Sequence, residues 1–307
     1  MRALPMLGRT LVVAAALFAW LALLGIWVPT LDVLASFLPL IGAALLVGVI
    51  LAGRSSRWLL PLAAVAAAPV AFATTHEAMR AIPAATTTAR PLRVLTHNVW
   101  VDNATPGATG AAIAAAAPDI ALLQETSRSR PLLLAAAAGT LPYATRCPNN
   151  RCGLAILSRW PIRASGYFLK DAHGLAFGPP ILWATIAVPG GAPVTVATLH
   201  YPWPLPAARA ASARAAMARA LGRIDRNALI LGGDMNLTPW SAAMRHQDTA
   251  LAPLVRMTCA AWSWPSGFAF LPIDQLYAGP AWGVIGVTRL AAAGSDHLPL
   301  LVTLGRR

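Results

Sequence analysis

Residues 229–236 read Leu-Ile-Leu-Gly-Gly-Asp-Met-Asn, an apolar strand-like run that ends in two polar side chains. Asp234 and Asn236 are two positions apart, and side chains with that spacing on an extended chain point to the same side. Both can therefore face one ligand group. Three further segments show the same change from apolar to polar: Leu-Leu-Gln-Glu125, Leu-His200 and Ser-Asp296-His297.

Carboxylates are scarce in the chain, which makes these positions stand out. Only 11 of the 307 residues are acidic, and nine of them lie from Pro91 onward. Four of the nine fall at the ends of apolar strand-like runs, where open α/β sheets usually place catalytic groups. The pattern predicts an active site built at strand ends.

The apolar residues, 57% of the chain, are concentrated at the N-terminus. Uncharged runs at about 11–28, 33–52 and 58–75 approach the length of about 20 residues that a bilayer requires, so residues 1–75 are expected to form three transmembrane helices. A cleavable signal peptide is the alternative for the first run, but a second apolar run follows closely. Pro61 and Pro69 interrupt the third run, which could instead lie on the membrane surface or enter the domain core.

The basic residues predict an orientation. Arg2 and Arg9 precede the first run, Asp32 lies between the first two runs, and Arg54 and Arg57 lie between the second and third. Because cytoplasmic flanks collect Lys and Arg, three spans would place the C-terminal domain outside the cytoplasm, anchored in the plasma or inner membrane. If the third run does not cross, that domain would be cytoplasmic.

Residues 76–90 are rich in Thr, Ala and Pro and are interpreted as a linker to a domain at 91–307. Within that domain, short β-type runs alternate with Ala-rich helical runs, which indicates an α/β or α+β fold with mixed sheets. Pro189-Gly190-Gly191 predicts a hairpin turn. Helices are expected at 108–117, 206–221 and 239–245, and strands at 92–97, 119–124, 154–158, 181–188, 194–199, 228–231, 273–277, 284–288 and 300–303.

Seven segments in order resemble the endonuclease/exonuclease/phosphatase superfamily, which includes deoxyribonucleases, neutral sphingomyelinases and inositol polyphosphate 5-phosphatases. The resemblance covers most of the chain from Pro91 to Leu304 and implies a four-layered sandwich of two mixed β-sheets flanked by helices. The segments are Leu95-Thr-His-Asn98, Leu122-Leu-Gln-Glu125, Gly153-Leu-Ala-Ile-Leu-Ser158, Thr198-Leu-His200, Gly233-Asp234-Met-Asn236, Ile273-Asp274-Gln-Leu and Ser295-Asp296-His297.

The chemistry of phosphodiester hydrolysis assigns a metal and a base. Glu125 is the expected ligand of Mg²⁺ (or Mn²⁺), since these cations prefer hard oxygen donors. By resemblance Asn98 lies beside it, on the metal or on the phosphate. Asp296 cannot orient its immediate neighbour His297, so it is interpreted as a group on the metal side or one that supports the metal ligands from outside. His297 is the expected general base because imidazole titrates near neutral pH, and the resemblance gives it Asp274 as orienting partner.

Three further residues are expected to handle the phosphate. Asp234 would position water or protonate the leaving oxygen, and Asn236 would donate to a non-bridging oxygen where negative charge builds. His200, by resemblance, is a second imidazole facing the phosphate. A Ser-His-Asp relay is excluded for residues 295–297, because three consecutive residues cannot form one.

The substrate class stays open between nucleic acid and phospholipid headgroups. From Pro91 onward there are 18 basic and nine acidic residues, a net charge of +9 that favours anionic partners. The aromatic residues Trp262, Trp264, Phe268 and Phe270 could face a membrane, stack on bases or fill the core. The lipid bilayer is an expected partner through the N-terminal helices, and no protein partner can be inferred.

Two alternatives remain at this stage. A catalytically silent member of the superfamily could use the same fold to bind an anionic ligand or to act as a scaffold, although the intact residue set favours an enzyme. Cys147 and Cys152 flank a short loop and could form a disulfide in an oxidising compartment or remain free thiols. Arg146 and Arg151, next to these cysteines, could contact phosphate or simply be solvated.

Overall fold

A computed structural model of the chain describes residues 3–145 and 153–307. Cys147 and Cys152, with Arg146 and Arg151, lie outside the described residues, so their pairing and contacts stay untested. The chain forms two compact units. The first comprises Met1–Arg80, Pro204–Ala211 and Leu237–His246, and the second comprises Ala81–Trp203, Ser212–Asn236 and Gln247–Arg307.

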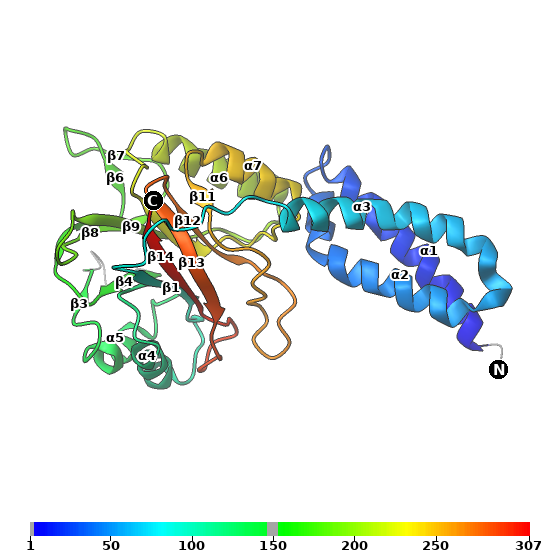
Figure 1. Cartoon of the computed structure of the whole chain (residues 1–307), viewed down its shortest axis with the longest axis horizontal. Coiled ribbons are helices and arrows are strands. Elements are labelled where there is room, and N and C mark those ends of the chain that lie inside the picture. Colours follow the sequence, from blue (N-terminus) through cyan, green and yellow to red (C-terminus); the bar gives the residue numbers. More distant parts are fainter. Residues whose placement is uncertain (1–2, 146–152) are drawn as a thin grey trace. The chain divides into compact units, whose positions relative to one another are not determined.

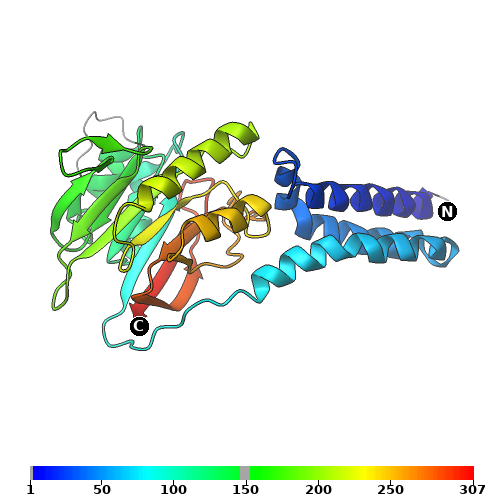
Figure 2. The same cartoon turned by 90° about the horizontal axis from the view of Figure 1, so that it is seen from above.

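Three helices, seen side by side in Figure 2, make up most of the first unit. Together with two short 3-10 turns they give three segments that are long and apolar enough to cross a membrane, Ala3–Leu24, Leu31–Ala52 and Ser56–Ala78. The elements are α1 (Ala3–Leu24), η1 (Leu31–Phe37), α2 (Leu38–Ala52), η2 (Arg54–Leu59) and α3 (Leu60–Ala78).

The third predicted span, 58–75, lies inside the apolar segment Ser56–Ala78, whereas the first is offset from its helix. The predicted span of about 11–28 is offset toward the C-terminus from α1, which begins at Ala3 and ends at Leu24. Arg9 is accommodated inside α1, where its Nε donates to Ser56 Oγ at 2.7 Å. The third helix continues through Pro69, which is buried, to Ala78.

Small residues allow the first two helices to approach closely. A Cβ on Gly8 would meet the backbone at Ala52 and Gly48, and a Cβ on Gly48 would meet Val12. Close backbone approach at small residues is the usual way in which apolar helices associate without a hydrophobic driving force between them. The helix pair is therefore specified by glycine as well as by apolar character.

Two six-stranded mixed sheets and a two-stranded ribbon form the second unit (Figure 1). The first sheet has the order β13-β14-β1-β2-β4-β3 and the second β11-β12-β10-β9-β8-β5. The strands are β1 (Leu92–Asn98), β2 (Ile120–Gln124), β3 (Tyr143–Ala144), β4 (Leu154–Ser158), β5 (Ile162–Gly166), β6 (Leu169–Lys170), β7 (Ala176–Phe177), β8 (Leu182–Ile186), β9 (Val194–His200), β10 (Ile230–Asp234), β11 (Val255–Arg256), β12 (Asp274–Ala278), β13 (Trp282–Arg289) and β14 (Leu300–Arg306).

The sheets are mixed, as the sequence predicts, because β1 pairs parallel with β2 and antiparallel with β14. In the second sheet β9 is parallel to β10, which is antiparallel to β12. The predicted hairpin is present as β8 and β9, with Gly190 in the turn at φ 67°. That left-handed conformation is open to glycine at little steric cost.

Alternate residues of the central strands serve two cores. Ile120 and Leu122 of β2 face the core between the sheets, whereas Ala121 and Leu123 face a second core that includes residues of two helices. Strands buried on both faces read as continuous apolar runs. Helices α4 (Pro106–Ala115) and α5 (Arg130–Ala137) lie on one side of the sandwich, with α6 (Ala207–Leu221) and α7 (Ala242–Ala250) on the opposite side (Figure 1). The expected four-layered architecture is confirmed.

Two helix predictions need correction. The helix expected at 239–245 begins at Ala242 instead, because Ser241 Oγ accepts the Met244 N–H at 3.1 Å and caps the helix. The residues before it form a turn, closed by the Ser241 N–H on Thr238 O. Helix α5, only eight residues long, is absent from the predicted elements.

The segment interpreted as a linker, 76–90, contains structure of its own. Helix α3 extends to Ala78, and the stretch after it adds to the edge of the first sheet. Val284 N donates to Pro83 O at 2.7 Å, Ala85 N to Val284 O at 3.1 Å, and Thr86 N to Arg306 O at 3.0 Å. The part of the linker next to β1 is thereby fixed to β13 and β14.

Candidate active site

Three neighbouring strands of the second sheet, β9, β10 and β12, place a row of polar residues at their ends, on one side of the sheet. In the register of that sheet, Asp234 at the end of β10 lies opposite His200 of β9 on one side and Asp274 of β12 on the other. Asp234 and Asp274 are both buried, whereas 32% of the His200 side chain is exposed. The row therefore runs from the protein interior to the surface.

Asn98, at the end of β1, connects the two sheets. Its Nδ2 donates to Glu125 Oε1 at 2.9 Å and to Asp234 Oδ2 at 3.1 Å. Its Oδ1 accepts the Trp100 N–H at 3.0 Å, so the amide oxygen is already engaged. Asn98 thus brings the carboxylates of Glu125 and Asp234 together by donating to both.

Two of these residues adopt left-handed backbone conformations that non-glycine residues seldom occupy. Glu125 follows β2 at φ 57°, and Asn236 follows β10 at φ 49°. Such conformations cost free energy and persist where the surroundings determine them. Val101 N donates to Glu125 Oε2 at 2.9 Å, and the Asn236 N–H donates to Asp234 Oδ1 at 2.9 Å. These bonds hold the Glu125 and Asp234 side chains at the site.

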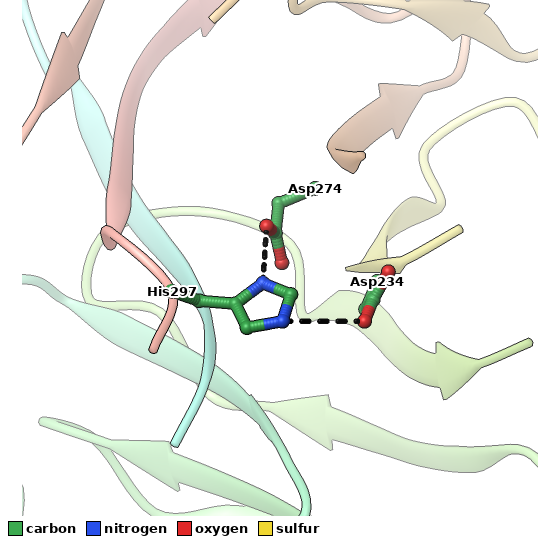
Figure 3. A group of neighbouring side chains, drawn as sticks. All are labelled: Asp234, Asp274 and His297. Carbon is green, nitrogen blue, oxygen red and sulfur yellow. Dashed lines mark hydrogen bonds and ion pairs between the residues drawn. The ribbon is translucent and has the colours of Figure 1, made fainter. Parts of the chain in front are cut away.

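His297 and Asp274 form a hydrogen-bonded pair (Figure 3). His297 Nδ1 is 2.8 Å from Asp274 Oδ2, and the opposite ring nitrogen, Nε2, is 3.7 Å from Asp234 Oδ2. Ser295 Oγ accepts the His297 N–H at 3.0 Å and donates to Asn98 O at 2.7 Å, which fixes the turn that carries the ring. Nε2 is the nitrogen left available for proton transfer.

Charge in this buried cluster is distributed unequally. Burial alone lowers the pKa of His297, but the charge and hydrogen bond of Asp274, with the charges of Asp234 and Asp296, outweigh it and raise that pKa to about 10. Burial raises the pKa of Asp234. Burial acts in the same direction on Asp274, yet the His297 charge and hydrogen bond lower its pKa overall.

His200 and Asn236 lie beside the carboxylates. His200 Nε2 is 3.5 Å from Asp234 Oδ2 and 3.7 Å from Glu125 Oε1, and it is 3.4 Å from Asn236 Nδ2. Asn236 Nδ2 also donates to Tyr201 O at 2.8 Å. The structure therefore brings His200, Asn236, Glu125 and Asp234 into one cluster.

Asp296, expected on the metal side, has a different neighbour. Its Oδ2 accepts the Trp264 indole N–H at 3.0 Å. Trp264 contacts the rings of Trp203, Phe270 and His297, at centroid distances of 5.9, 6.4 and 6.4 Å. Of the four aromatic residues considered from sequence, Phe268 has the most exposed side chain, at 75%. Trp264 differs from Phe268 in that it contacts the turn that carries His297, through the Asp296 carboxylate and the His297 ring.

The donor set suits a hard divalent cation at Glu125. Two carboxylates, Glu125 and Asp234, converge on one amide, and carboxylate oxygen is the preferred ligand of Mg²⁺. Ligand atoms of Asp234, Asp274 and His297 also lie within 4.8 Å of one another. There, however, His297 Nδ1 and Asp274 Oδ2 already bond to each other. The Glu125 carboxylate, which is partly exposed, is the better fit.

His97 is a neighbour of the site that the sequence interpretation left without a role. The side chain is buried, and its Nε2 is 3.3 Å from His297 O. Burial lowers the pKa of His97 to about 4, so the ring is neutral at physiological pH. Its position within Leu95-Thr-His-Asn98, one residue before Asn98, was the only available signal.

The model of the Endonuclease/Exonuclease/phosphatase family matches residues 95–297. No curated protein matches the sequence.

Solved structures share the fold at low sequence identity. The human Nocturnin catalytic domain with bound sulfate is 19% identical with a TM-score of 0.56, covering 71% of this chain and 95% of that one. Sphingomyelinase C from Streptomyces griseocarneus is 19% identical with a TM-score of 0.51, covering 69% and 99%. A Staphylococcus aureus beta toxin mutant with bound magnesium is 15% identical with a TM-score of 0.51, covering 70% and 99%.

At these identities the likeness shows the fold alone. The family match is the stronger observation, because it spans about two thirds of the chain, from the strand that carries Asn98 to His297 itself. The chain belongs to the endonuclease/exonuclease/phosphatase family.

Proposed function

We propose that the chain is a membrane-anchored, divalent-metal-dependent phosphodiesterase. Members of its family are generally hydrolases of phosphodiester bonds. The observation that carries the proposal is the arrangement of His297: Asp274 engages Nδ1 at 2.8 Å, and Nε2 points toward the cluster of Asp234, Asn98 and Glu125. That geometry suits a base whose tautomer and orientation are fixed.

In the proposed mechanism His297 Nε2 takes a proton from the attacking water. Asp274 holds the proton on Nδ1 and stabilises the imidazolium that forms. Asp234, whose pKa is raised by burial, is suited to position water or to protonate the leaving oxygen. Asn236 and His200 donate to the phosphoryl oxygens, where negative charge builds.

Glu125 is the proposed metal ligand, and Asn98, whose Nδ2 donates to Glu125 Oε1, lies beside it on the metal or on the phosphate. Asp296 is a further candidate on the metal side. A bound Mg²⁺ or Mn²⁺ would polarise the phosphate, and its positive charge would lower the pKa of His297 toward the range a base needs. The beta toxin neighbour carries bound magnesium, which supports this choice of cation.

The proposed substrates are phosphodiesters of nucleic acid or of phospholipid headgroups. The C-terminal part, from Pro91 onward, has a net charge of +9, which attracts both. A sphingomyelinase among the structural neighbours supports the lipid arm. The three apolar helices are proposed to anchor residues 1–75 in the membrane, with the linker and the catalytic domain outside the cytoplasm.

The test uses the full chain in detergent or nanodiscs, with Mg²⁺ or Mn²⁺ and with EDTA. Substrates are bis-p-nitrophenyl phosphate, DNA, RNA and vesicles of anionic phospholipid. Turnover that requires metal and is lost in His297→Ala and Glu125→Ala, but kept in the control Asp225→Asn, supports the proposal. Metal-independent turnover, or no turnover on any substrate, contradicts it and favours a binding module.

Reporter fusions after Thr88 test the side of the membrane, and a cytoplasmic signal contradicts the proposed orientation.

A further inference from the structure

The turn between the first two apolar helices carries one buried carboxylate. Asp32 is 7% exposed and is the acidic residue between Leu24 and Leu38. Its Oδ1 accepts the Ala242 N–H at 2.7 Å, and its Oδ2 accepts the Ala243 N–H at 2.8 Å. Both donors begin helix α7, and all of these residues belong to the first compact unit.

This contact satisfies both partners. The first N–H groups of a helix have no acceptor within the helix, and the positive end of the helix dipole favours a carboxylate. A buried carboxylate, in turn, requires hydrogen-bond donors. A second contact lies alongside, since Trp240 Nε1 donates to Ser36 O at 3.3 Å.

The capped helix follows closely after Asn236. Five residues separate Asn236 from Ala242, and they are all buried: Leu237, Thr238, Pro239, Trp240 and Ser241. A short buried connection leaves little room for independent movement, because packed interiors do not deform continuously. A shift at the start of α7 is therefore transmitted along the chain toward Asn236.

We propose that Asp32 is a positioning residue for the active site. By fixing the start of α7 to the turn between α1 and α2, it holds the loop that carries Asn236 in its left-handed conformation. The inference rests on the proposed function for its effect on catalysis, whereas the contact itself does not depend on that function.

The contact also bears on topology. Hydrogen bonds between Asp32 and residues 242–243 require the α1–α2 turn and that segment to lie on one side of the membrane. Arg54 and Arg57 lie in the next turn, at the other ends of α2 and α3. With the basic turn cytoplasmic, Asp32 and the segment Leu237–His246 lie outside.

The test compares full-length wild type, Asp32→Ala, Asp32→Asn and the exposed control Asp225→Ala in nanodiscs. Hydrogen exchange of peptides covering residues 240–250 reports the contact without any need for activity. Asp32→Ala is expected to speed that exchange by about tenfold, as the loss of a helix cap does, and to lower kcat by about tenfold at unchanged KM. Asp32→Asn, which keeps one acceptor oxygen, should fall between.

Unchanged exchange over residues 240–250 in Asp32→Ala would overturn the contact. Faster exchange there with unchanged kcat would overturn the positioning role. If no variant or wild type turns over any substrate, the proposed function fails and with it the positioning role, but the exchange result still decides the contact. If Asp32→Ala does not fold, Asp32→Asn carries both readouts.

Discussion

Asp234 and Asp274 lie directly opposite each other in the β10–β12 register, yet the pKa of Asp234 is raised while that of Asp274 is lowered. The difference follows from the hydrogen bond that His297 Nδ1 makes with Asp274 at 2.8 Å, whereas Nε2 is 3.7 Å from Asp234. Neighbouring carboxyl groups whose pKa values are separated in this way can take different roles in acid–base chemistry.

The first prediction concerns the coupling of His297 and Asp274. Each of His297→Ala and Asp274→Asn should lower kcat/KM by about 10²- to 10⁴-fold, the range for loss of a general base. Because Asp274 acts through the ring, the double variant should be little worse than His297→Ala. Steady-state kinetics of the four proteins measures this. Multiplicative losses would contradict a shared role.

Elements of the fold that depend mainly on the local sequence pattern could be predicted. Strands such as 92–97 and 119–124 could be predicted because they are buried on both faces and read as continuous apolar runs. The cluster of Glu125, Asp234 and His297 was predictable from the motifs. Helix α5 was missed because the helix itself is only eight residues long. Helix α7 was misplaced because its start is set by the Ser241 cap.

Other features depend on tertiary packing that no local pattern records. The carboxylate of Asp296 accepts the indole N–H of Trp264, which comes from a separate loop. Residues 83–87 have the composition of a linker, but they pair with β13 and β14 because the edge of that sheet offers free backbone groups. Both outcomes require the folded sheet to exist first.

The second prediction concerns metal binding. Glu125→Gln keeps the shape of the side chain but removes its charge, so the affinity for Mg²⁺ or Mn²⁺ should fall by at least about tenfold. Titration calorimetry with either ion measures this without reference to activity. Asn98→Ala should weaken binding as well, since Asn98 Nδ2 holds both carboxylates. Asp225→Asn is the matched control, and equal affinity in all of these proteins would exclude the Glu125 site.

The third prediction concerns the ion pair between Arg256, which is buried, and Asp248. Arg256 is 2% exposed and bonds Asp248 through Nε at 3.1 Å and Nη2 at 3.0 Å, while Tyr277 Oη donates to the same carboxylate at 2.6 Å. Arg256→Ala should lower the free energy of unfolding by about 3 kcal/mol, near the lower end for buried pairs, because Asp248 is partly exposed. Tyr277→Phe should cost about 1 kcal/mol.

Chemical denaturation of full-length protein measures both changes. The exposed pair of Arg128 and Asp102 supplies the control, since Arg128→Ala should change the free energy of unfolding by less than about 1 kcal/mol. Equal effects of Arg256→Ala and Arg128→Ala would show that burial of the first pair contributes nothing.

The last prediction concerns His97 and acid stability. Its pKa is lowered by burial from 6.5 to about 4, so between those pH values the unfolded chain binds a proton that the folded chain does not. The free energy of unfolding should therefore fall as the pH drops from 6.5 toward 4, by about 3 kcal/mol from this residue. His97→Phe cannot titrate and should lose that part of the pH dependence. Exposed His173→Phe should retain it, and denaturation curves collected from pH 4 to pH 7 for the three proteins decide the matter: parallel profiles for wild type and His97→Phe would mean that the buried ring is protonated as readily as a free one.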